Sequence, residues 1–193
     1  MKFPLQGRSV AILVDNGFEQ IELISPMAAL TAAGASVDIV SPTASTVRGW
    51  NHMEWGRLFS VTRTLDDVDA NTYDALLLPS GIITPDHLRS SLPALEFIRG
   101  FFAYGKPVAA ICQGPQLLVD ADVVRGRILT SFDMVRIDLR RAGALWLDEP
   151  VVVDHGLVTS RSPADLPAFN RSMVEAFAAA PPARLAEQWI HSR

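Results

Sequence analysis

The residue in this chain with the clearest chemical potential is its single cysteine. Cys112 lies in the stretch KPVAAICQGPQLL (106–118), between an apolar run and a Gly-Pro pair. The apolar run predicts a buried strand, Gly114 permits a sharp turn, and Pro115 suits the first turn of a following helix. In this strand–turn–helix context, typical of a nucleophile elbow, the helix N-terminus lowers the thiol pKa and the backbone N–H of Gln113 faces a developing oxyanion. The alternative is an inert core cysteine, the commoner role in an apolar run.

The elements that must position this cysteine follow an alternating pattern. Apolar runs predict strands at 9–14, 35–40, 73–79 and 107–111, and two short strands within 151–159. Helical spacing predicts helices at 19–33, 91–104, 116–124 and 164–180, with a kink at Pro26 in the first. Residues 43–69 lack a clean period and predict a hairpin or a long loop with short strands. Strands that alternate with helices predict an α/β fold, a flavodoxin-like parallel sheet sandwiched by helices.

Composition predicts one soluble, cytoplasmic domain spanning residues 1–193, with a core at about 8–180. The chain has 193 residues, 49% of them hydrophobic and 20% charged, and a net charge of −4. This charge gives no reason to expect nucleic acid or an anionic membrane as a partner. No apolar run approaches the roughly 18 residues of a membrane span, and the N-terminus lacks the features of a signal peptide. Clusters of Cys or His and phosphate-binding glycine motifs are absent from the sequence, which predicts neither a metal nor a cofactor.

Four sequence stretches resemble motifs of one known family. AAICQGPQLL around Cys112 resembles the AxxCxGP elbow of the ThiJ/PfpI family. DNGFEQIELISPMAAL (15–30), YDALLLPSG (73–81) and VVVDHGLVTSRSPADL (151–166) resemble three further motifs, and all four occur in the family's order. The chain is therefore identified as a member of the ThiJ/PfpI family, in the class I glutamine amidotransferase-like superfamily. PfpI-type intracellular peptidases and glyoxalase- or deglycase-type proteins are its relatives there.

The resemblance implies an acidic partner for the thiol. In the family, an acid from the first helix is protonated and donates a hydrogen bond to the cysteine thiolate. That residue corresponds to Glu22, with Glu19 one turn earlier on the same face. A carboxyl group buried near a thiolate is pushed toward its neutral form, which makes this pairing physically reasonable. The alternative is that both glutamates only favour the N-terminus of a helix.

The resemblance also implies binding groups beside the elbow. Gly81 matches the second glycine of a family turn that supplies an oxyanion N–H, and Ser80 replaces the first glycine and adds a hydroxyl. Asp86 occupies the place of a glutamate that PfpI-type peptidases bring in from a neighbouring subunit. His87 follows it in an expected loop, as a candidate site residue or as a solvated loop histidine.

The chain departs from the family pattern where an imidazole is usual. Gln113 stands where PfpI-type peptidases have histidine, and glutamine cannot exchange a proton near neutral pH. Phe132 stands where other members have a later histidine. These departures argue against triad-type peptidase activity. Among the other histidines, His52 lies in the irregular segment and His155 in a turn, and neither position favours catalysis.

Two functional hypotheses remain open at this point. In the first, Cys112 and Glu22 carry out cysteine-dependent hydrolase- or lyase-type chemistry on a small carbonyl substrate, as in glyoxalases and deglycases. In the second, the protein is a non-catalytic redox-sensing or protective stress-response protein that uses oxidation of Cys112. The resemblance also implies a homodimer or a higher homo-oligomer, and Trp50 and Trp55 suggest a partner face. Arg161 is interpreted as a structural ion pair with Asp165 rather than as part of the site rim.

Overall fold

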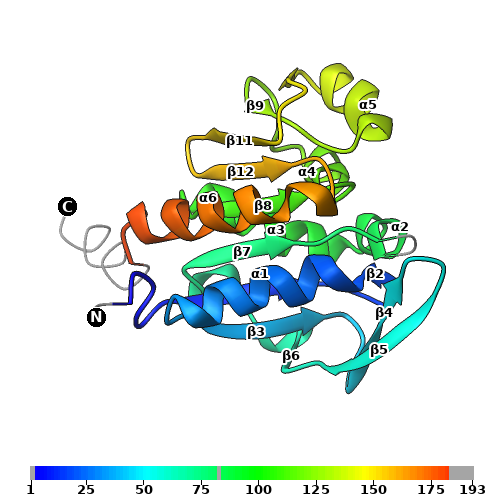
Figure 1. The fold of residues 1–193 in the computed structure, drawn as a ribbon, viewed down its shortest axis with the longest axis vertical. Helices are drawn as coiled ribbons and strands as arrows, with labels where there is room; N and C mark the ends of the chain where they lie inside the picture. Colours follow the sequence, from blue (N-terminus) through cyan, green and yellow to red (C-terminus); the bar gives the residue numbers. More distant parts are fainter. Residues whose placement is uncertain (1–2, 82–83, 183–193) are drawn as a thin grey trace.

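The centre of the fold is a mostly parallel sheet, seen in the computed structural model, which describes residues 3–81 and 84–182 (Figure 1). Its strands are β1 (Ser9–Leu13), β3 (Ser36–Ser41), β6 (Arg63–Thr64), β7 (Ala75–Leu78), β8 (Val108–Ile111), β11 (Val151–Asp154) and β12 (Leu157–Ser160). They pair in the order β11-β12-β8-β7-β1-β3-β6. Every neighbouring pair is parallel except β11 and β12, which form an antiparallel hairpin at one edge.

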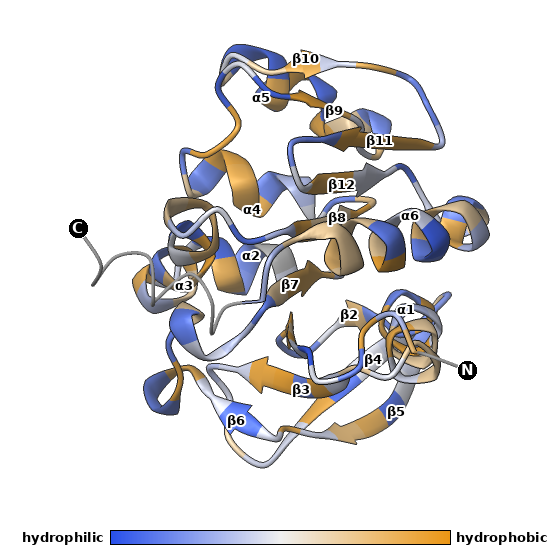
Figure 2. Ribbon diagram, turned by 90° about the vertical axis from the view of Figure 1, so that its left-hand side faces the viewer, coloured by the Kyte–Doolittle hydropathy of each residue, from blue (hydrophilic) through white to orange (hydrophobic). Residues whose placement is uncertain are grey.

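Helices cover both faces of this sheet because its strands are apolar on both sides. Helices α1 (Gln20–Ala32) and α6 (Leu166–Ala179) pack together on one face (Figure 1). Helices α3 (Leu92–Ala103) and α4 (Pro115–Asp120) pack on the other. In β1, Val10 and Ile12 belong to the core under α1 and α6, whereas Ala11 and Leu13 belong to the core under α3 and α4. Figure 2 shows the same pattern, with hydrophobic colours on the inner strands and mixed colours on the helices.

Smaller elements surround the sheet. Strands β2 (Phe18–Glu19), β4 (Thr46–Asn51) and β5 (Glu54–Ser60) form a three-stranded sheet, and β9 (Ile128–Leu129) pairs with β10 (Leu145–Trp146). Short helices α2 (Thr84–Arg89) and α5 (Arg136–Arg141) lie toward the carboxyl ends of the parallel strands (Figure 1). Four 3₁₀ helices complete the fold: η1 (Leu65–Asp67), η2 (Ala70–Thr72), η3 (Asp133–Val135) and η4 (Pro163–Asp165).

The predicted fold class is confirmed, and so are the strands and longer helices. Two local expectations were wrong or incomplete. The segment after Gly81 was expected to be a loop, but Thr84–Arg89 is helical. The helix after Cys112 ends at Asp120 because the chain turns at Asp122, whose φ is +55°. The two short strands predicted within 151–159 pair as an antiparallel hairpin around the expected turn at His155-Gly156.

Within the described ranges, no helix is long and apolar enough to cross a membrane.

Candidate active site

Cys112 sits on a strained turn between β8 and α4. Its φ is +60°, in the left-handed region that non-glycine residues rarely adopt. Two backbone hydrogen bonds hold it there, since its N–H donates to the Ser160 carbonyl at 2.9 Å and its carbonyl accepts from the Phe132 N–H at 2.8 Å. The side chain is partly exposed. This is the geometry of a nucleophile elbow, as the sequence predicted.

Two glycines allow this turn to pack against its neighbours, and neither does so by a left-handed backbone. Gly114 has a φ of −50°, so it permits the sharp turn through its missing Cβ rather than through a left-handed backbone. A Cβ on Gly114 would lie 2.5 Å from the Leu78 carbonyl oxygen and 2.9 Å from that of Ile111. A Cβ on Gly81 would collide with the Gly17 carbonyl, because Gly81 forms a backbone bridge with Phe18. Both glycines are needed for close approach of backbone to backbone.

Glu22 is fully buried in α1 and faces this turn. Its Oε2 accepts a 2.8 Å hydrogen bond from the Ser80 N–H. Its Oε1 is buried and has no hydrogen-bond partner that meets ordinary geometry among the described residues, although the carboxyl group interacts with the Cys112 thiol. Burial raises the pKa of Glu22 to about 7, against opposing hydrogen bonds from Ser80. Near neutral pH a sizeable fraction of this carboxyl group is therefore protonated.

The Cys112 thiol shares this buried environment. Burial raises its pKa, and the negative charge of Glu22 raises it further. The Ser80 side chain and the Gln113 backbone N–H act in the opposite direction, because they donate hydrogen bonds to the thiolate. The prediction that the turn lowers the thiol pKa was wrong, because burial and the charge of Glu22 outweigh these hydrogen bonds. Because a negative charge on either group disfavours ionisation of the other, the pair loses its first proton at a lower pH than its second.

Ser80 and Glu19 complete the surroundings of this pair. Ser80 is 2% exposed and contributes its side chain to both Glu22 and Cys112. Glu19 precedes α1, and its N–H donates to the Ser80 carbonyl at 2.8 Å. Burial raises the pKa of Glu19 and the charge of His52 lowers it. Glu19 also raises the pKa of Glu22, so the two acids lie near one another.

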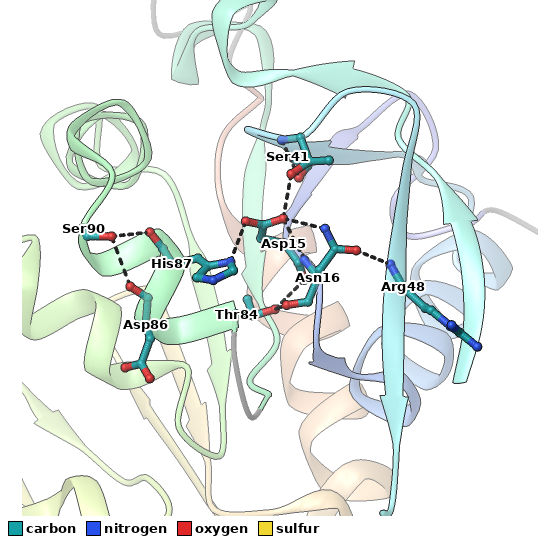
Figure 3. A network of polar contacts seen from close by, with 9 residues as sticks. Asp15, Asn16, Ser41, Arg48, Thr84, Asp86, His87 and Ser90 are labelled. Atoms are coloured by element: carbon teal, nitrogen blue, oxygen red, sulfur yellow. Dashed lines mark hydrogen bonds and ion pairs between the residues drawn. The ribbon is translucent and has the colours of Figure 1, made fainter. Parts of the chain in front are cut away.

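Asp86 and His87 lie on α2 and point to different surroundings. The Nδ1 atom of His87 lies 3.2 Å from Oδ2 of the buried Asp15, and Thr84 donates to the backbone of Asp15 and Asn16 (Figure 3). These contacts hold the start of α2 against the loop at Asp15 and Asn16, which lies beside Gly81. The side chain of Asp86 is 76% exposed and points away from that network (Figure 3).

The histidines, Arg161 and the two tryptophans singled out in the sequence make contacts with residues other than Cys112. His52 lies near Glu19, and His87 and His155 lie beside aspartates, so no described histidine is hydrogen-bonded to Cys112. The predicted ion pair of Arg161 with Asp165 is confirmed at 3.1 Å, and Arg161 also contacts Asp148 at 2.8 Å. Trp50 and Trp55 pack edge to face, with ring centroids 5.4 Å apart.

A cleft of about 270 Å³ adjoins the elbow. Gly81 and Gln113, whose backbone N–H groups were predicted to stabilise an oxyanion, are part of its lining. Sequence reasoning found Asp86 but missed the other polar residues of the cleft. Of these, only Gln116 carried a signal, because it stands one turn after Gln113. The full lining is Gly81, Asp86, Arg89, Gln113, Gln116, Met134, Val135 and Asp138. In the part of the chain that the structure describes, no three His, Cys, Asp or Glu side chains are arranged to hold a metal ion.

Comparisons with known proteins show which proteins this chain resembles. Residues 8–176 match the DJ-1/PfpI family. The chain is 43% identical over 165 residues to YraA of Bacillus subtilis, whose name describes a cysteine protease, covering 86% of this chain and 95% of that one. It is 44% identical over 167 residues to protein/nucleic acid deglycase 2 of Escherichia coli, covering 86% and 95% of the two chains. A two-domain Anabaena variabilis structure with DJ-1/ThiJ/PfpI-like and ferritin-like domains superposes with a TM-score of 0.83 at 31% identity. That match covers 94% of this chain and 54% of the other.

Proposed function

The chain belongs to the DJ-1/PfpI family, and from that premise we propose that it is a cysteine-dependent enzyme acting on small carbonyl compounds in the manner of a glyoxalase or deglycase. Cys112 is the nucleophile and Glu22 carries the proton. The backbone N–H groups of Gly81 and Gln113 stabilise the oxygen anion that forms. This assignment agrees with the name of the Escherichia coli relative and does not depend on an imidazole.

One observation carries the proposal: a buried carboxyl group with one oxygen held and the other unpartnered stands beside a strained cysteine. The Ser80 N–H fixes Oε2 of Glu22, which leaves Oε1 to exchange a proton with the thiol or with a bound substrate. A pKa of about 7 suits a group that both takes and gives a proton near neutral pH.

The proposed reaction uses the thiol, the carboxyl group and water, and it needs no metal or oxidant. The sulfur of Cys112 forms a bond to the aldehyde carbon of a ketoaldehyde, and the carbonyl π bond breaks. The thiol proton passes through Glu22 to the carbonyl oxygen, which gives a hemithioacetal. Glu22 then moves the proton from the former aldehyde carbon to the ketone carbon, and the hydroxyl proton of the hemithioacetal passes to the ketone oxygen, which gives a thioester of the hydroxy acid. Water breaks the carbon–sulfur bond of this thioester, releases the hydroxy acid and regenerates the thiol.

Triad-type peptidase activity receives less support, although a relative's name describes a cysteine protease. Peptide hydrolysis requires protonation of a poor leaving amine, usually by an imidazole held beside the thiol. Gln113 occupies the adjacent position, and the described histidines have other partners.

Turnover of phenylglyoxal by the purified protein tests the proposal. We expect the wild type to form the hydroxy acid, and Cys112→Ser and Glu22→Gln to lose at least 100-fold in kcat/KM with an unchanged circular dichroism spectrum. A protein that gains mass with peroxide at Cys112 but turns over no carbonyl compound would instead support the redox-sensing alternative.

A further inference from the structure

The cleft beside the elbow has an uneven distribution of charge. Asp86 enters it from α2 and Asp138 from α5, so a carboxylate stands on either side. The nearest cation to Asp86 is Arg89, at 4.0 Å. Asp138 has no ion pair among the residues that the structure describes. Both carboxylates are therefore available to a bound molecule.

The one cation in the cleft lining is already engaged. Arg89 donates to both carboxylate oxygens of Asp120 in α4, at 3.1 and 3.2 Å. This paired contact offsets the charge of Arg89 and fixes its orientation. Asp86 and Asp138 then leave the cleft with an excess of negative charge, to which Glu22 and the Cys112 thiolate add when they ionise.

The neutral part of the lining suits a small polar molecule. Gln113 and Gln116 present amide groups one helical turn apart, and Met134 supplies an apolar contact. The volume of about 270 Å³ lies just below the range of common ligand pockets and fits one side chain or a molecule of that size.

We propose that this cleft selects carbonyl substrates that carry a cationic group, ammonium or guanidinium, and disfavours those that carry a carboxylate or a phosphate. Asp86 and Asp138 are the residues that determine this specificity. This inference rests on the proposed function, since it names the substrate class of that site.

The test uses three phenylglyoxals with para substituents of different charge: trimethylammonium, hydrogen and carboxylate. The ratio of variant to wild-type kcat/KM is taken for each compound, because this ratio cancels intrinsic reactivity. For Asp138→Asn and Asp86→Asn we expect a roughly two- to fivefold loss with the cation, no change with the neutral compound, and a similar gain with the anion. Added salt should weaken both effects.

Glu175→Gln is the matched control, because it removes the same charge from an exposed position on α6, across the sheet. Equal responses of the three compounds in either Asn variant would overturn the proposal. So would a wild-type preference for the anion, which would show that Arg89 governs the cleft.

Alkylation of Cys112 separates this inference from the proposed function. Bromoethylamine, iodoacetamide and iodoacetate are cationic, neutral and anionic reagents that require no turnover. If no phenylglyoxal is converted, the proposed function fails, while a selective slowing of bromoethylamine by Asp138→Asn still supports the charge selection. Equal slowing of all three reagents contradicts it.

Discussion

Replacing Glu22 with glutamine should remove a specific pH dependence of stability. The buried carboxyl group has a pKa raised by burial to about 7 in the folded chain, against 4.5 as its ordinary value. Between these two pH values the folded chain holds a proton that the unfolded chain has lost. The free energy of unfolding therefore falls as the pH rises through this window and levels off above it.

The size of the effect follows from that interval. A difference of about 2.5 pH units corresponds to about 3 kcal/mol, at 1.36 kcal/mol per unit. Most of this loss, about 2–3 kcal/mol, should occur between pH 5 and pH 8. Glutamine keeps an oxygen that can accept from the Ser80 N–H and never ionises. The stability of Glu22→Gln relative to the wild type should therefore rise by about 2–3 kcal/mol between pH 5 and pH 8.

Urea unfolding at several pH values, with reductant present, measures this difference. Other titrating groups contribute equally to both proteins, so only the difference between them is interpreted. Glu175→Gln serves as the control for loss of an exposed carboxylate and should follow the wild type at every pH. If Glu22→Gln shows the same pH slope as the wild type, the buried carboxyl group does not hold the proton and the reasoning is wrong.

Three further substitutions test other parts of the site. Ser80→Ala removes a group that favours ionisation of both Glu22 and Cys112, so alkylation of the thiol at pH 8 should slow by roughly three- to tenfold. In urea unfolding, Cys112→Gly should have a free energy of unfolding about 1 kcal/mol higher than that of Cys112→Ala, because only glycine accepts a φ of +60° without strain. The reverse order of stability would remove the evidence for a strained elbow. Gly81→Ala should cost about 1–3 kcal/mol, measured by thermal unfolding, since its Cβ meets the Gly17 carbonyl, and an unchanged melting temperature would contradict that packing.

The sequence predicted the elements that bury apolar surface and the residues carried by strong motifs. The run before Cys112 and the helix around Glu22 have patterns that only a buried strand and a packed helix satisfy. Their meeting at one edge follows because the carboxyl ends of parallel strands lie together. The fold class was predictable for the same reason.

What the sequence missed depends on contacts between distant residues. No local pattern indicates that Cys112 itself has a left-handed backbone, which hydrogen bonds to Ser160 and Phe132 hold in place. Helix α2 is six residues long and carries too little apolar periodicity to reveal itself. Asp138 enters the cleft because α5 packs against α4 and β10, which no local pattern indicates.

The way the elbow is held also bears on how the chain folds. Cys112 is fixed by Ser160, and Glu22 by Ser80, so each bond closes a loop of several dozen residues. Loops of this length close late, after the strands between them have paired. While these loops are open, Cys112 is an ordinary, solvent-accessible thiol, and its native environment arises only with the complete sheet. The single cysteine thus gives a built-in probe: pulsed alkylation during refolding would report when the central sheet closes.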